Sequence, residues 1–135
     1  MSVRSAAALA LLLLVIEPGM SVASAQGHEP VWLEGTWVGT WWMGKYEEPI
    51  EIMLSQRGVG LSGQVAMLGY PGAGGREGPF PIESGSLDGS RLMLVWLIEG
   101  RRFTAELLLS TPGMLIGLGG EDGQVAAGFG LNRVR

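Results

Sequence analysis

The chain offers few residues that could carry out catalysis. His28 is its only histidine, and it has no cysteine, so Ser–His or Cys–His chemistry would depend on one imidazole in a polar segment. Glu29 and Glu34 lie near His28, but one imidazole is a poor metal site without further clustered ligands. No serine lies in a G-x-S-x-G turn. We therefore predict no metal site, no cofactor and no enzymatic activity.

One glycine motif has the letters of a nucleotide site. Residues Gly58–Gly63 match G-x-G-x-x-G, a motif in which the glycines must open a helix so that a pyrophosphate can bind at its N-terminus. An alternating apolar pattern follows here instead of a helical one. The motif therefore indicates a turn and the start of a strand.

Carboxylates occur in two groups, around Glu47–Glu51 and at Glu121-Asp122. Two carboxylates in a cleft can act as the acid and base of glycoside hydrolysis. Glu51 falls on the polar face of its segment, however, and the second pair lies in a turn, where Asp is common. We interpret both groups as solvated charges.

The elements that would hold these residues are strands. From Gly35 onward, short alternating apolar runs end at glycine-rich turns, and no stretch has a helical period. The clearest alternation puts Ile50, Ile52 and Leu54 on one face and Glu51 and Arg57 on the other. The pattern predicts strands over 36–43, 47–57, 59–67, 80 onward, 91–98, 102–109, 114–118 and 125–133.

Short hairpins between these strands predict an all-β fold. About eight antiparallel strands can close into an up-and-down barrel, which removes the sheet edges. A two-sheet sandwich is the competing architecture. The pattern places Val59 and Val125 on inner faces, and the glycine-rich segment Gly69–Gly78 is expected to be a mobile surface loop.

The N-terminal residues are typical of an export signal. Arg4 precedes the apolar run 5–16, and Ala23-Ser24-Ala25 provides a cleavage site before Gln26. We expect residues 1–25 to be removed, leaving a loosely held tail, Gln26–Glu34, and a barrel domain over 35–135. The net charge of −4 argues against nucleic acid and anionic membrane surfaces as partners.

Several short motifs resemble one known family. The segment LEGTWVGTW from Leu33, the step at Gly58–Gly63, the turn LDGSRL from Leu87 and the terminal LNRVR are together similar to bacterial lipocalin-like small β-barrels. The resemblance implies that Trp37 packs in the closed end of the barrel under Arg133. A guanidinium over an indole contributes about 0.5–2 kcal/mol. The chain departs from secreted lipocalins in having no cysteine and no helix after the last strand.

Five tryptophans in 135 residues are the most suggestive remaining feature. Inward aromatic and aliphatic side chains either pack a core without disulfides or line an apolar cavity, and an eight-stranded barrel leaves space for either. The candidate cavity-lining residues are Trp41, Ile52, Leu54, Met67, Trp96, Phe103 and Phe129.

Other apolar residues are expected on the outside. Trp42, Met93, Val95 and Leu97 would face outward and form a patch for a protein partner or lipid. A small outer-membrane barrel would need an apolar outside and a polar lumen. The alternation around Glu51 and Arg57 contradicts that arrangement, so we do not expect the mature chain to span a membrane.

The predicted function is that of a non-catalytic binding module in the bacterial periplasm or medium. Its ligand would be a small apolar molecule, or its partner a protein bound at the outward patch. The alternative is an inhibitor or accessory barrel whose tail, Gln26–Glu34, reaches into the cleft of a secreted enzyme.

Overall fold

The computed structural model describes residues 31–71, 78–111 and 113–134. In sequence order the strands are β2 (Gly35–Met43), β3 (Tyr46–Arg57), β4 (Gly60–Met67), β5 (Phe80–Asp88), β6 (Arg91–Ile98), β7 (Arg101–Thr111), β8 (Met114–Glu121) and β9 (Ala127–Arg133). Each strand pairs with the next in antiparallel fashion, and β9 pairs back with β2. The predicted all-β, eight-stranded up-and-down barrel is therefore confirmed, and the sandwich is wrong.

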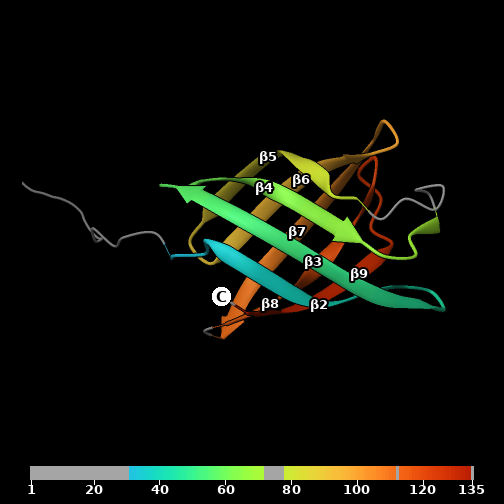
Figure 1. Ribbon diagram of the computed structural model, residues 1–135, viewed down its shortest axis with the longest axis horizontal. Helices are drawn as coiled ribbons and strands as arrows, with labels where there is room; N and C mark the ends of the chain where they lie inside the picture. Colours follow the sequence, from blue (N-terminus) through green and yellow to red (C-terminus); the bar gives the residue numbers. More distant parts are fainter. Residues whose placement is uncertain (1–30, 72–77, 112, 135) are drawn as a thin grey trace, which may run out of the picture. The chain divides into compact units, whose positions relative to one another are not determined.

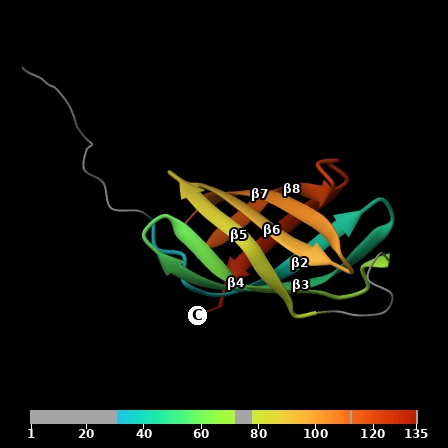
Figure 2. The ribbon, with the colours of Figure 1, turned by 90° about the horizontal axis from the view of Figure 1, so that it is seen from above.

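The strands cross the barrel at a tilt, so that strands on the near wall run across those on the far wall (Figures 1 and 2). The closing pair aligns Trp37 with Arg133 and Trp41 with Phe129. None of the described residues forms a helix long and apolar enough to cross a membrane.

Inside–outside alternation determines where the core lies. Ile50, Ile52 and Leu54 on β3 are buried, while Glu51 and Arg57 are exposed. The same rule holds along β6, where every second residue is buried, and over residues 103–107 of β7. Apolar side chains from all eight strands therefore meet in one continuous core.

Two inward glycines allow the strands to approach one another closely. A Cβ on Gly39 would lie 1.9 Å from the Gly130 carbonyl oxygen, and one on Gly63 would lie 1.9 Å from that of Met53. Gly63 also has a φ of 132°, which side chains disfavour. Glycine at such positions lets a sheet curl sharply enough to close.

Two predicted inner residues lie outside. Val59 occupies the turn between β3 and β4, and Val125 precedes β9; both are exposed. The inward face of β4 begins only at Leu61, and that of β9 at Ala127. Strand alternation does not continue through either segment, because the backbone there is not in a strand.

Candidate functional site

The seven predicted cavity-lining residues all point into the barrel and are buried. Three of the aromatic rings contact one another there. Trp96 stacks on Phe103 with ring centroids 4.9 Å apart, and Phe129 meets both rings edge-on at 6.4 and 6.0 Å. Side chains fill this part of the interior, as they can in an eight-stranded barrel.

Tyr70 closes the adjoining end of the barrel. Its ring contacts Trp41 and Phe103 edge-on, with centroids 5.5 and 5.7 Å away. Its hydroxyl donates to Glu121 Oε2, while Glu121 Oε1 forms an ion pair with Arg101, whose Nε lies 3.1 Å away. Burial, followed by the contact with the Glu121 carboxylate, raises the pKa of Tyr70 well above its usual value.

Sequence reasoning missed Tyr70 because it lies in the segment Gly69–Gly78, which was assigned to a surface loop. For Tyr70 that prediction is wrong: the ring is buried in the core cluster. The indole of Trp41 also donates to the Leu68 carbonyl at 2.9 Å, which holds the start of the segment against the barrel. The one feature of the sequence that could have identified Tyr70 is that it is the single aromatic residue in this glycine-rich segment.

The opposite end of the barrel is closed by Trp37 and Arg133. The Arg133 guanidinium carbon lies 4.5 Å from the centre of the Trp37 ring. Arg133 also donates to the carbonyls of Trp32 and Glu34 at 2.6 and 3.0 Å. The Trp37 indole donates to the Leu33 carbonyl at 3.0 Å, so the closing pair and the segment before β2 hold one another.

The described part of the expected tail, Val31–Glu34, is bound to the barrel rather than loosely held. The Gln56 side chain accepts from Leu33 N at 2.6 Å and donates to the Val31 carbonyl at 2.8 Å. Leu33 itself is fully buried. The expected export signal, residues 26–30 of the tail and His28 lie outside the described residues. An inhibitory tail would therefore depend on those residues.

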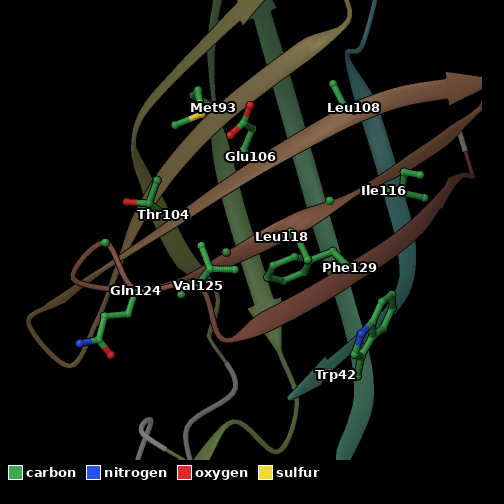
Figure 3. Close-up of a pocket in the computed structure, with 14 residues that line it drawn as sticks. Trp42, Met93, Thr104, Glu106, Leu108, Ile116, Leu118, Gln124, Val125 and Phe129 are labelled. Carbon is green, nitrogen blue, oxygen red and sulfur yellow. The ribbon is translucent and has the colours of Figure 1, made fainter. Parts of the chain in front are cut away.

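A groove of about 650 Å³ lies on the outside of the barrel, across β7, β8 and β9 (Figure 3). We call it the outer groove. Its apolar side chains are Trp42, Met93, Leu108, Ile116, Leu118, Val125 and the core residue Phe129. Its polar side chains are Thr104, Glu106 and Gln124, and the chain around Gly117–Gly120 forms part of its lining.

Trp42 forms one edge of the outer groove and lies flat on β9. A Cβ on Gly128 would lie 2.3 Å from the Trp42 ring, whereas one on Gly130 would lie 3.8 Å away. Trp42 is still 45% exposed. Because neither glycine has a side chain, the indole packs directly over the β9 backbone, and part of it stays exposed to solvent.

The predicted outward patch is divided by the structure. Trp42, Met93 and Leu97 are exposed and Val95 is half-buried, but only Trp42 and Met93 line the outer groove. The residues that join them, including Leu108, Ile116 and Leu118, were not assigned to this surface. Residues 114–118 are nearly all apolar, so the pattern does not show which side of β8 faces outward.

One carboxylate of the outer groove is paired with an arginine of the neighbouring strand. Glu106 Oε2 lies 2.9 Å from Arg91 Nη1, on the neighbouring strand β6. Glu47 and Glu51 are exposed on β3, where they pair across to Trp42 and Val38 of β2. Among the residues that the structure describes, no three metal-ligating side chains cluster. The groove therefore presents an apolar surface with a few polar groups at its border.

No protein-family model, no curated protein and no solved structure matches this chain. The structure shows an eight-stranded antiparallel β-barrel, and no family is identified.

Proposed function

We propose that this chain is an exported, non-catalytic binding module of the lipocalin-like kind, which holds a small apolar molecule in the outer groove and not in the barrel interior. One contrast supports the proposal. Aromatic rings fill the barrel interior, and both of its ends are covered. The outer surface, by contrast, exposes Leu118, Ile116 and Trp42 around the outer groove. A volume of about 650 Å³ lies within the usual range for small-molecule sites, about 300–1,000 Å³.

The lining also restricts the ligand. Aliphatic side chains in the middle of the groove suit an apolar body, and Thr104 and Gln124 provide hydrogen-bonding groups beside it. Glu106 is the only ionised group in the lining, and it is paired with Arg91. The groove therefore favours a neutral or weakly basic amphiphile over a carboxylate, which would meet the Glu106 charge.

A binding measurement with a neutral probe tests the proposal. We expect the wild-type protein to bind 1-N-phenylnaphthylamine with a rise in probe fluorescence and saturable, micromolar affinity. Leu118→Glu places a charge in the groove and should weaken binding at least tenfold, about 1.4 kcal/mol. Val59→Glu is the matched control, because Leu118 and Val59 are 56% and 57% exposed. It should bind the probe as wild type does.

Two results would contradict this location of the site. The first is equal binding by wild type and Leu118→Glu. The second is a probe that binds only after Tyr70→Ala opens the end of the barrel, which would assign binding to the interior. Circular dichroism of each variant checks that the fold is kept.

A further inference from the structure

The middle of the outer groove is a row of residues that pair across four strands. Glu106 on β7 pairs with Leu118 on β8. Leu118 pairs in turn with Gly128 on β9, and Gly128 with Trp42 on β2. Neighbouring strands lie about 4.8 Å apart, so the backbones at the two ends of this row are about 14 Å apart along the sheet. Figure 3 shows Glu106 and Trp42 on opposite sides of Leu118. The row therefore has a carboxylate at one end, an indole at the other and an apolar middle.

The Glu106 carboxylate is only partly engaged. Its Oε2 lies 2.9 Å from Arg91 Nη1, and the Glu106 and Arg91 side chains are 47% and 59% exposed. Its Oε1 has no hydrogen-bond partner among the residues that the structure describes. Ion pairs as exposed as this one are weak, because water solvates both charges. Arg91 does not line the groove, so a cation in the groove can bind this carboxylate beside Arg91 or in its place.

The carboxylates at the other side of the groove are not neutralised. Glu47 is exposed and pairs across to Trp42. Neither Glu47 nor the next outward carboxylate of β3, Glu51, has an ion-pair partner within the described ranges. The outward arginine of β7, Arg102, is paired with Glu83 at 3.3 Å. The charges left around the groove are therefore negative, and their potential attracts cations and repels carboxylates.

We propose that the ligand of the outer groove is a cationic amphiphile: an organic ammonium whose nitrogen binds Glu106 and whose apolar body lies over Leu118 toward the Trp42 ring. The inference rests on the proposed function, because it names the class of ligand for the same groove. Glu106 selects the head group, and the apolar row holds the body. A neutral alcohol would make the apolar contacts alone, and a carboxylate would be repelled by Glu106.

Calorimetric titration with three ligands of one chain length tests the head-group preference. Octylammonium, octanol and octanoate share an apolar chain and differ in charge at pH 7. We expect wild type to bind octylammonium about threefold to fivefold more tightly than octanol, the range for a partly exposed ion pair, and to bind octanoate most weakly. The preference should decrease when salt is raised from about 20 to about 500 mM, because ions screen the charges.

Two variants at the ion pair separate the head group from the apolar body. Glu106→Gln should bind octylammonium only as tightly as octanol, with octanol affinity unchanged. Arg91→Ala leaves the Glu106 carboxylate without its present partner and should strengthen octylammonium binding alone. Glu83→Gln is the matched control, because Glu83 is also paired with an arginine and its side chain is 41% exposed, but it lies on β5 and does not line the groove. It should keep the wild-type preference.

The inference is overturned if wild type binds octanol as tightly as octylammonium. It is also overturned if Glu106→Gln keeps the preference, or if Glu106→Gln and Glu83→Gln weaken octylammonium binding equally. In each of these cases, binding of 1-N-phenylnaphthylamine that Leu118→Glu weakens would leave the proposed function standing for neutral molecules. If wild type binds neither this probe nor any of the three octyl ligands, the proposed function and the inference are both refuted.

Discussion

At the scale of single residues, the contact between Trp42 and Gly128 shapes the outer surface. The indole covers a glycine on the neighbouring strand, so an apolar ring is held flat without a bulky residue beneath it. An aromatic ring that packs over a glycine of the neighbouring strand is a known way of stabilising a sheet at that position. Here the contact also fixes one edge of the groove.

Substituting this glycine should move the ring. Gly128→Ala would place a Cβ 2.3 Å from the Trp42 ring, and because Trp42 is partly exposed, the indole can turn outward instead of unfolding the barrel. We expect acrylamide to quench a larger share of the tryptophan fluorescence, with a stability loss below about 1 kcal/mol. Gly130→Ala, whose Cβ would lie 3.8 Å away, should leave quenching unchanged. Equal quenching in both variants would contradict the seating of Trp42.

At the scale of elements, the sequence predicts the strands. It predicts the contacts that cover the two ends of the barrel only in part. Alternation on β3 and β7 predicts their buried faces, because apolar residues on one side of each strand alternate with polar or charged residues on the other. The Trp37–Arg133 contact agrees with the parity of the first and last strands.

Other features depend on distant pairing, which local patterns do not encode. Tyr70 is 51 residues from Glu121, and Gln56 is 23 residues from Leu33. The outer groove was predicted only through Trp42 and Met93, because residues 114–118 could face either way. Local alternation assigns faces within a strand, but it does not say which loop folds back over the barrel end.

Tyr70 should make stability depend on alkaline pH. Because its pKa is higher in the folded state than in the unfolded state, its contribution is complete below about pH 10, the ordinary tyrosine pKa. It then decreases as pH rises, since the unfolded chain releases the proton first. Urea denaturation from pH 8.5 to 11 should show wild type losing up to about 1.4 kcal/mol per pH unit above 10 relative to Tyr70→Phe. If the free energy of unfolding changes with pH equally in the two proteins, burial and Glu121 do not raise the pKa of the Tyr70 hydroxyl.

At the scale of the whole molecule, two separate sets of contacts cover the two ends of the barrel. The segment Val31–Glu34 is held at one end by Gln56 and Arg133, and Tyr70 is held at the other by Glu121. Figure 1 shows the start of β2, which follows the first segment, and the end of β4, which precedes Tyr70, at opposite ends of the barrel. They share no contact, so the energetic effects of changing them should be independent.

A double-mutant cycle tests that independence. Gln56→Ala removes the bonds to Leu33 and Val31 and should cost about 1–3 kcal/mol, and Tyr70→Phe should cost about 1 kcal/mol at pH 7. The double variant should lose the sum within about 0.5 kcal/mol by urea denaturation. Gln64→Ala controls for the first change, because Gln64 is also half-buried but its side chain forms no hydrogen bond with the described residues. A coupling energy well above 0.5 kcal/mol would show that the two ends act as one unit.

The pairing of β2 with β9 has a consequence for how the chain reaches its folded state. The two strands that close the cylinder are nearly a hundred residues apart in sequence (residue 37 faces residue 133), so no shorter stretch can protect both borders of the growing sheet. Until the final strand arrives, β2 and β8 each leave a row of amide and carbonyl groups available to any neighbouring polypeptide. Completion is therefore a late, long-range event, and the period before it is when the chain is most exposed to mispairing with others.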